Sequence, residues 1–231
     1  MQISTNIIII AILGGILPSF LWLKFWFKED KHQEPRGLML KVFVFGMLAV
    51  PVAILLEKGV SNIIPDYTFL SFLLWAIIEE GLKFASAYFP ALRTRFADEP
   101  IDMVLYMITA ALGFSALENS LFLLGPLSEG NLLKGLATLD FRFIGASLLH
   151  ILTSGAVGIC MAETFYRSNK AKWLAFFSGI TIAVLLHALF NNFIIGSKFG
   201  VMISFGAVWI GIIAIILILE KIKKIKNIHK I

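Results

Sequence analysis

The residues best suited to chemistry are ionisable side chains that interrupt long apolar segments. Glu79 and Glu80 are adjacent carboxylates, and Lys83 follows them by four and three residues. On a helix, Lys83 can therefore pair with either carboxylate. A buried ion pair that only stabilises the bundle would account for one of the two. The other would lack a partner and could act as a general base, since charged residues inside membranes usually serve a function.

Two further segments carry polar side chains of the same kind, and a lone histidine lies between them. Glu118 stands beside Asn119 in an otherwise apolar segment, and His150 follows farther along the chain. His187 and Asn191 are four residues apart, which places an imidazole and a carboxamide on one face of a helix. Histidines in helix bundles also serve as hydrogen-bonded packing residues, and this alternative stays open for His150.

The composition places these side chains inside a membrane. Of the 231 residues, 58% are hydrophobic and 21 are Phe, and the mean hydropathy is +0.87, which is too apolar for a soluble core of this size. A membrane-spanning helix needs about 20 mostly apolar residues. Seven windows satisfy this requirement: Ile3–Leu23, Leu38–Leu56, Thr68–Phe89, Ile101–Leu124, Phe143–Phe165, Trp173–Ile195 and Gly200–Leu219. The sequence therefore predicts an all-α, polytopic membrane helix bundle with about seven transmembrane helices.

Short polar breaks separate the windows and leave no room for a soluble domain. Turn-forming pairs such as Pro65-Asp66 and Gly125-Pro126 lie in these breaks. Residues 1–6 contain no Lys or Arg, so we expect the first window to be an uncleaved helix. We expect residues 1–231 to form one integral membrane domain, with its chemical motifs between residues 68 and 195. The single cysteine, Cys160, excludes an intrachain disulfide.

The positions of Lys and Arg predict the orientation, because cytoplasmic loops are enriched in both. One set of loops and the tail carry most of the cations: Lys24, Lys28, Lys31, Arg36, Arg93, Arg95, Arg167, Lys170, Lys172, Lys221, Lys223, Lys224, Lys226 and Lys230. The opposite loops carry only Lys58, Lys134, Arg142 and Lys198. We therefore expect the N-terminus outside and the C-terminus inside. The basic tail is interpreted as an anchor at anionic lipid and not as a nucleic-acid site.

This topology places the candidate side chains at similar depths. At a helix rise of about 1.5 Å per residue, Asn191, Glu118, His150, His187 and Glu79 lie roughly 6 to 16 Å below the outer helix ends. All five fall in the outer half of the bilayer. Residues that packed separate helices would have no reason to share one level, so we expect a single site.

Carboxylates and imidazoles around a wet cavity suit the activation of water. A glutamate can take a proton from water, or Glu and His side chains can hold a divalent metal such as zinc that acidifies its bound water. Both alternatives, with and without a metal, stay open. A carboxamide and a second imidazole can stabilise the oxyanion that forms when water attacks a carbonyl. Peptide hydrolysis fits this set, and nothing indicates a serine or cysteine nucleophile.

Four motifs, in this order, resemble those of the PrsW family of bacterial intramembrane proteases. The motifs are Glu79-Glu80-x-x-Lys83, Phe114-x-x-x-Glu118-Asn119, Arg142 followed by His150, and His187-x-x-x-Asn191. They span the third to the sixth predicted helix. The family is distantly similar to the CAAX prenyl endopeptidases and the bacteriocin-immunity proteins.

The resemblance implies an endopeptidase of the bacterial cell membrane with a single-span membrane protein as its substrate. Its expected reaction is the first, extracytoplasmic-side cut in a membrane-anchored anti-sigma factor. By the same resemblance, Glu79 is the base that activates water and Glu80 supports it. His187 and Asn191 form the oxyanion group.

Glu118 departs from the pattern of the related CAAX endopeptidases, which carry histidine at this place. The departure leaves the role of Glu118 open. It also leaves a metal site made of Glu118, His150 and His187 as an alternative.

Two other classes of function remain as alternatives. A small proton-coupled transporter would also need carboxylates and histidines around an intramembrane cavity, but the chain lacks the paired halves with broken helices that many transporters show. A non-catalytic immunity or chaperone protein would keep the bundle without the chemistry. The presence of Glu79 and Glu80 together with His150 and His187 argues against it.

Overall fold

The computed structural model describes residues 4–30, 32, 34–196 and 198–226, and in these residues it contains helices and no strand. The helices are α1 (Thr5–Phe27), α2 (Arg36–Ser61), α3 (Phe69–Ala87), α4 (Pro100–Ser128), α5 (Leu132–Phe141), α6 (Ser147–Glu163), α7 (Asn169–Gly196) and α8 (Lys198–Ile222). Two π-helical turns, η1 (Tyr88–Leu92) and η2 (Arg142–Ala146), follow α3 and join α5 to α6. The all-α prediction is confirmed. Ile3, Lys31 and Lys230, which entered the predictions above, lie outside the described residues.

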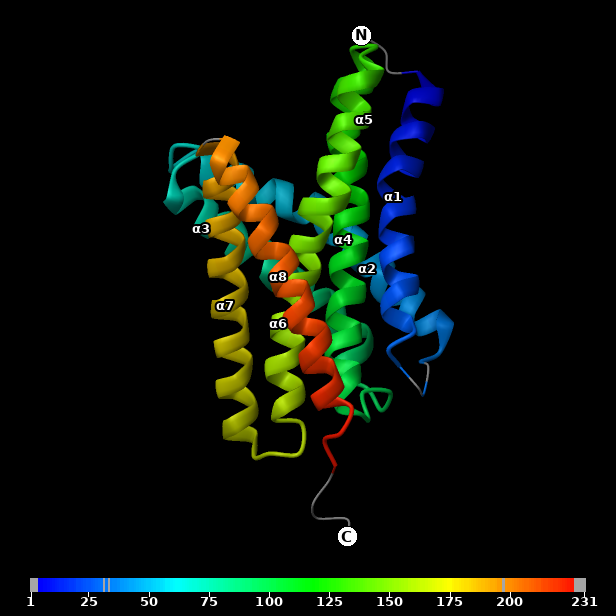
Figure 1. Cartoon of the computed structure of the whole chain (residues 1–231), viewed down its shortest axis with the longest axis vertical. Helices are drawn as coiled ribbons and strands as arrows, with labels where there is room; N and C mark the ends of the chain where they lie inside the picture. The colour runs from blue at the N-terminus through cyan, green and yellow to red at the C-terminus, as the bar shows by residue number, and fades with distance from the viewer. Residues whose placement is uncertain (1–3, 31, 33, 197, 227–231) are drawn as a thin grey trace.

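The bundle contains the predicted spanning helices. In the part of the chain that the structure describes, six helices are long and apolar enough to cross a membrane, with α5, η2 and α6 forming one of them over Leu132–Glu163. Helix α3, with 19 residues, is the seventh, and its apolar sequence is interrupted by Glu79, Glu80 and Lys83. Helix α1 begins and α8 ends at opposite ends of the bundle, as an odd number of spans requires (Figure 1). That α1 begins outside the cell stays a prediction.

Helix α4 lies at the centre of the bundle. Nearly every side chain from Pro100 to Ala116 is buried, and α4 packs against α1, α2 and α6. Helices α7 and α8 pack against α6, and α3 packs against both α2 and α7. Figure 1 accordingly shows α6, α7 and α8 on one side of α4 and α1 on the other. A polar group on the inner faces of these helices is therefore shielded from lipid.

Two glycines allow α2 and α4 to approach each other closely. A Cβ atom at Gly46 would collide with the carbonyl oxygen of Ala110, and one at Gly113 would collide with that of Phe43. Close packing of small residues is a main source of helix association in membranes, because lipid removes the hydrophobic driving force. The contact fixes the distance between α2 and the part of α4 that carries Glu118.

A capping box determines where α3 begins. The Thr68 hydroxyl accepts a hydrogen bond from the Ser71 amide at 3.2 Å, and the Ser71 hydroxyl accepts one from the Thr68 amide at 3.0 Å. Just before the cap, Tyr67 adopts a positive φ of 61°, which reverses the chain between α2 and α3. The cap places Glu79 about three turns into the helix.

The sequence predicts a break at Gly125-Pro126, but the helix is not interrupted there. Helix α4 continues through Pro126 to Ser128, because a proline in the last turn removes only one of the few remaining helical hydrogen bonds. The chain reverses instead at Gly130, whose φ of 71° favours glycine.

Candidate active site

Glu80 and Lys83 form a fully buried ion pair on α3. Both side chains are 0% exposed, and Lys83 Nζ lies 2.9 Å from Glu80 Oε1. Thr153 and Ser154 of α6 donate hydrogen bonds to the same carboxylate at 3.1 and 3.4 Å, and His187 Nδ1 of α7 lies 2.8 Å from Oε1. A buried carboxylate is tolerated only when it is paired and hydrogen-bonded in this way. Glu80 therefore joins α3, α6 and α7.

Glu79 instead faces a cavity. Its side chain is 10% exposed and lines the cavity wall. Oε2 lies 3.1 Å from Lys83 Nζ and 3.9 Å from His187 Nε2. The contact between Lys83 and Glu79 is an ion pair, but its geometry does not meet the requirements of a hydrogen bond. Oε2 is therefore a buried acceptor without a hydrogen-bond donor among the described residues. Of the paired carboxylates, Glu79 is the one open to a ligand.

His150 connects Lys83 to Glu118. Its Nδ1 lies 2.7 Å from Lys83 Nζ, and its Nε2 lies 3.0 Å from Glu118 Oε2. An ammonium group can only donate, so Nδ1 accepts from Lys83, and Nε2 carries the proton that is donated to Glu118. The protonation of this imidazole is thereby fixed by its two neighbours.

Arg142 completes this chain of polar contacts. Its Nη2 donates to Glu118 Oε2 at 2.5 Å, and its Nε donates to the Asn119 side-chain oxygen. Asn119 in turn donates to the hydroxyls of Ser115 and Ser147 at 3.1 and 3.0 Å. The guanidinium also lies over the Phe122 ring, 3.9 Å from its centroid. Glu118 is therefore held by a cation on one side and by His150 on the other.

The π turn η2 explains how Arg142 and His150 reach the same carboxylate. Eight residues of ideal α-helix rotate roughly 80° beyond two full turns, so the two side chains would point in different directions. A π turn with hydrogen bonds from i to i+5 accommodates an extra residue and changes this rotation. Both side chains then contact Glu118 Oε2.

These residues surround a cavity of about 660 Å³ between α2, α3, α4, α6 and α7. Glu79, Glu118, His150, His187 and Asn191 all line it. The parts of these helices that line the cavity lie toward the end of the bundle where α1 begins. The cavity is therefore in the half of the bundle that is predicted to face outward. Glu80, buried behind Glu79, does not line the cavity. The structure thus brings five of the six predicted catalytic residues to one surface and places the sixth behind them.

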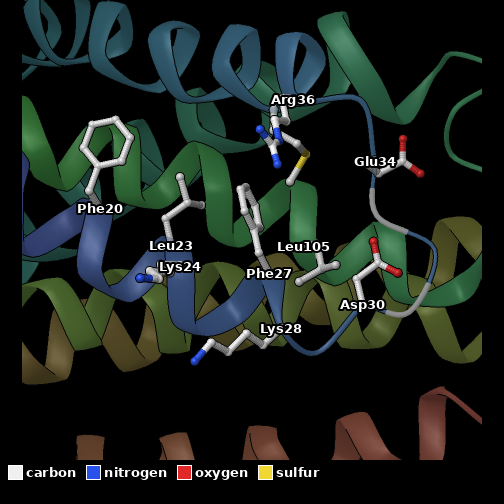
Figure 2. A pocket seen from close by; sticks show the side chains of 10 residues that line it. Phe20, Leu23, Lys24, Phe27, Lys28, Asp30, Glu34, Arg36 and Leu105 are labelled. Atoms are coloured by element: carbon white, nitrogen blue, oxygen red, sulfur yellow. The ribbon is translucent and has the colours of Figure 1, made fainter.

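A second, smaller cavity of about 420 Å³ lies at the opposite end of the bundle, between α1 and α2. Figure 2 shows Lys24 and Lys28 on one side of it and the carboxylates of Asp30 and Glu34 on the other. None of the predicted site residues lines it. Nearby, the Asp102 carboxylate accepts backbone hydrogen bonds from Asp98 and Glu99, so it caps the start of α4.

Comparison with known proteins identifies the family. Residues 34–219 match the family described as PrsW family intramembrane metalloprotease. The chain belongs to the PrsW family. The family match and the helices able to span a membrane make the protein an intramembrane protease and a multi-pass bacterial membrane protein.

Individual relatives agree over most of their length. Protease PrsW of Clostridioides difficile strain 630 is 27% identical over 219 residues, which cover 91% of this chain and 87% of the relative. Protease PrsW of Bacillus subtilis strain 168 is 27% identical over 187 residues, which cover 78% and 80%. Protease PrsW of Geobacillus kaustophilus strain HTA426 is 26% identical over 183 residues, which cover 78% and 77%. No solved structure gives a significant match.

The family description names a metalloprotease, and three side chains of the site offer donors for a metal once Lys83 moves away from His150 Nδ1. Glu79, His150 and His187 each offer a ligand atom, and these three atoms lie within 4.8 Å of one another. Two histidines and a glutamate are a donor set that zinc uses in hydrolases. The hydrogen bond between His187 Nδ1 and Glu80 is the outer-shell contact that usually orients a metal-binding imidazole. This group contains Glu79 in place of Glu118, which the sequence analysis had grouped with the two histidines.

Three residues of the cavity wall were missed by the sequence analysis. Glu57 lies one residue beyond the predicted end of the second window, but α2 continues to Ser61 and carries it into the cavity. Trp75 also lines the wall, and its position four residues before Glu79 was the available signal. Tyr67 precedes the α3 cap, and no sequence pattern distinguishes it from an ordinary loop residue.

Proposed function

We propose that the protein is an endopeptidase that hydrolyses a peptide bond with a water molecule activated at Glu79, acting as a single membrane-embedded domain. The observation that carries this proposal is the placement of Glu79. Its carboxylate lines a large intramembrane cavity and has an oxygen without a hydrogen-bond donor among the described residues. His187 Nε2 lies 3.9 Å from this oxygen, close enough to contact the same water.

In the reaction, Glu79 takes a proton from water as the water oxygen bonds to the carbonyl carbon of the scissile peptide. The negative charge moves to the carbonyl oxygen, where the Asn191 carboxamide donates a hydrogen bond. His187 assists as an imidazolium, because Nδ1 already carries the proton donated to Glu80 and Nε2 needs a second proton to act as a donor. Glu79 then returns its proton to the leaving nitrogen as the C–N bond breaks. Glu80 and Lys83 hold Glu79 and His187 in place.

A metal would change how water is activated but not the residues that surround it. When bound by Glu79, His150 and His187, a divalent ion would supply a bound water of lowered pKa. Glu80 and Glu118 would then orient the two imidazoles through the ring nitrogens they contact. His150 Nδ1 would be available to the ion only after Lys83 Nζ, which lies 2.7 Å from it, had moved away. Glu79 would act as a ligand and not as the base, which is the difference between the two schemes.

The proposed substrate is a single-span membrane protein, and the family resemblance suggests an anti-sigma factor that is cut first on its extracytoplasmic side. Two features support this proposal. The cavity lies in the outward half of the predicted topology, and its walls combine polar groups with apolar residues such as Phe72 and Ile194. A transmembrane segment could bring both its apolar residues and its polar backbone into such a site.

The test is reconstitution in liposomes with single-span substrates, including candidate anti-sigma factors. Mass spectrometry of the products locates the cut, and we expect it near the outer end of the substrate helix. Glu79→Gln and His187→Ala should abolish cleavage, whereas Glu129→Gln, at an exposed residue outside the cavity, should not. Cleavage that persists in Glu79→Gln would contradict the mechanism. Cuts only in the cytoplasmic half would contradict the proposed substrate orientation.

A further inference from the structure

Glu57 presents a carboxylate to the active-site cavity that the proposed mechanism does not use. It lies on the face of α2 that also directs Val50, Ala53 and Ile54 to the cavity. The residue is half-buried, and the described residues offer it no hydrogen bond and no ion pair. It lies near enough to Glu79, Glu118 and Lys83 to interact with their charges.

Two cations, Lys83 and Arg142, are shared among four carboxylates, and in the part of the chain that the structure describes Glu57 is the one of the four without an ion pair. Glu118 is paired with Arg142 at 2.5 Å, and Glu79 is paired with Lys83 at 3.1 Å. A negative charge on Glu57 would therefore lie beside two other carboxylates, in a place partly removed from water. Such an arrangement is unfavourable in the empty site and becomes favourable when a ligand brings a cation.

The position of Glu57 indicates where that cation would lie. Glu57 is four residues from the end of α2, and Glu79 is ten residues from the start of α3 at the same end of the bundle. At about 1.5 Å per residue, Glu57 lies roughly 9 Å nearer that end than Glu79. An extended peptide covers this distance in about three residues.

We propose that Glu57 is a specificity-determining residue that binds a Lys or Arg side chain of the substrate, two to four residues from the scissile bond on the outward side. The proposal rests on the proposed function, since it assumes that a peptide occupies the cavity. Because the reaction cuts within a chain, the cation is a side chain and not a terminal amine. Glu57 touches no reacting atom, so it selects the substrate without taking part in the chemistry.

The experiment compares matched single-span substrates that carry Lys, Gln or Glu at each of the five positions on the outward side of the scissile bond. Binding is measured in nanodiscs with Glu79→Gln as the inactive background, and cleavage is measured with the active protein. We expect the Lys substrate to bind about tenfold more tightly than the Gln substrate at one of these positions. The preference should decrease as salt is added, because it is electrostatic.

Variants of Glu57 assign the preference to this side chain. Glu57→Gln should remove the preference for Lys while leaving kcat on the Gln substrate within about twofold, and Glu57→Lys should reverse it in favour of Glu. Glu57→Asp keeps the charge and should retain the preference for Lys. This variant serves as the second test if Glu57→Lys does not fold. Glu129→Gln removes an exposed carboxylate from the same end of the bundle and should leave the preference unchanged.

Two outcomes would overturn the inference: equal binding of the Lys and Gln substrates by the protein with Glu57 intact, or a Lys preference that survives in Glu57→Gln. Binding and cleavage separate this inference from the proposed function. Charge-dependent binding that vanishes in Glu57→Gln, without any cleavage by the active protein, would support the role of Glu57 and count against the proposed chemistry alone.

Discussion

The two nitrogens of His187 are directed to the two adjacent carboxylates of α3: Nδ1 lies 2.8 Å from Glu80 Oε1, and Nε2 lies 3.9 Å from Glu79 Oε2. Adjacent residues on a helix point about 100° apart, so a single imidazole between two neighbouring glutamates can distinguish them. The Glu80 carboxylate is fully occupied by its buried partners and fixes the imidazole ring of His187. Glu79 remains available to water, to a metal or to both.

This difference predicts opposite defects for two otherwise identical substitutions. Glu79→Gln should lower kcat by about 10²-fold or more and leave stability close to that of the parent protein, since the buried Lys83 keeps its ion pair with Glu80. Glu80→Gln should destabilise the fold by about 3 to 5 kcal/mol, because it weakens the pairing of the buried Lys83. Activity and thermal unfolding in the same detergent measure both effects. Equal loss of stability in the two variants would contradict this assignment.

The core should tolerate the buried charge of Lys83 only because Glu80 is paired with it. Lys83→Met alone leaves Glu80 buried without its cation and should be strongly destabilising, by about 3 to 5 kcal/mol. In Glu80→Gln/Lys83→Met the pair is replaced by uncharged side chains, so the double variant should be more stable than the sum of the single effects predicts. Thermal unfolding of the four proteins forms the double-mutant cycle. Additive effects would mean that the two charges do not stabilise each other.

Metal content should follow the donor set that the structure brings together. If a divalent ion is bound, Glu79→Ala, His150→Ala and His187→Ala should each reduce the metal retained after dialysis by at least about tenfold. Glu118→Gln, which alters contacts to His150 and Arg142 but removes none of the three donors, should reduce it less. Elemental analysis of the purified variants measures this directly. If Glu118→Gln lost its metal as completely as His187→Ala, the result would support Glu118, His150 and His187 as the metal ligands instead.

The helices and the grouping of the site could be predicted because they depend on strong, local signals. Long apolar windows identify spanning helices, and the cost of a charge in lipid singles out Glu79, Glu80 and Lys83. The common depth of His150 and His187 then follows from helix geometry. These signals require no knowledge of how the helices pack.

The assignment of partners could not be predicted, because it depends on rotations between helices. Sequence spacing allowed Lys83 to pair with either glutamate, and only the packing of α6 and α7 against α3 buries Glu80 and turns Glu79 to the cavity. The π turn before His150 has no sequence signal among those considered. Glu57 was missed for a third reason, since a charge near a helix end is normally expected to reach water.

Glu34, in the loop before α2, should make stability depend on pH. Burial raises its pKa above the ordinary value of 4.5, and nearby Asp98, Asp30 and Glu99 add to this effect, while the neighbouring Tyr106 hydroxyl opposes it. The folded protein therefore holds this proton more tightly than the unfolded chain. Its favourable contribution is complete below pH 4.5 and is lost as the pH rises through the raised pKa.

Replacing Glu34 removes this dependence. Glu34→Gln should unfold at a higher temperature than the parent protein at pH 8, and the difference should shrink toward zero at pH 4. Thermal unfolding across this range measures the difference, with Glu129→Gln as an exposed control. A gain that is the same at both pH values would show that the carboxylate's titration is not its origin.

Arg142 should influence activity through the residues it holds. Arg142→Lys keeps the charge but cannot donate to Glu118 and Asn119 from one rigid plane, so Glu118 and then His150 lose their fixed positions. We expect kcat to fall by about 10- to 100-fold with the fold retained. Because the change acts through His150, the pH dependence of kcat should also shift. Lys134→Met, which removes an exposed cation paired with Glu129, should leave both the rate and its pH dependence unchanged. A loss of kcat without any change in the pH profile would assign Arg142 to packing alone, whereas a shift that Glu118→Gln reproduces would place the effect on the path from Arg142 through Glu118 to His150.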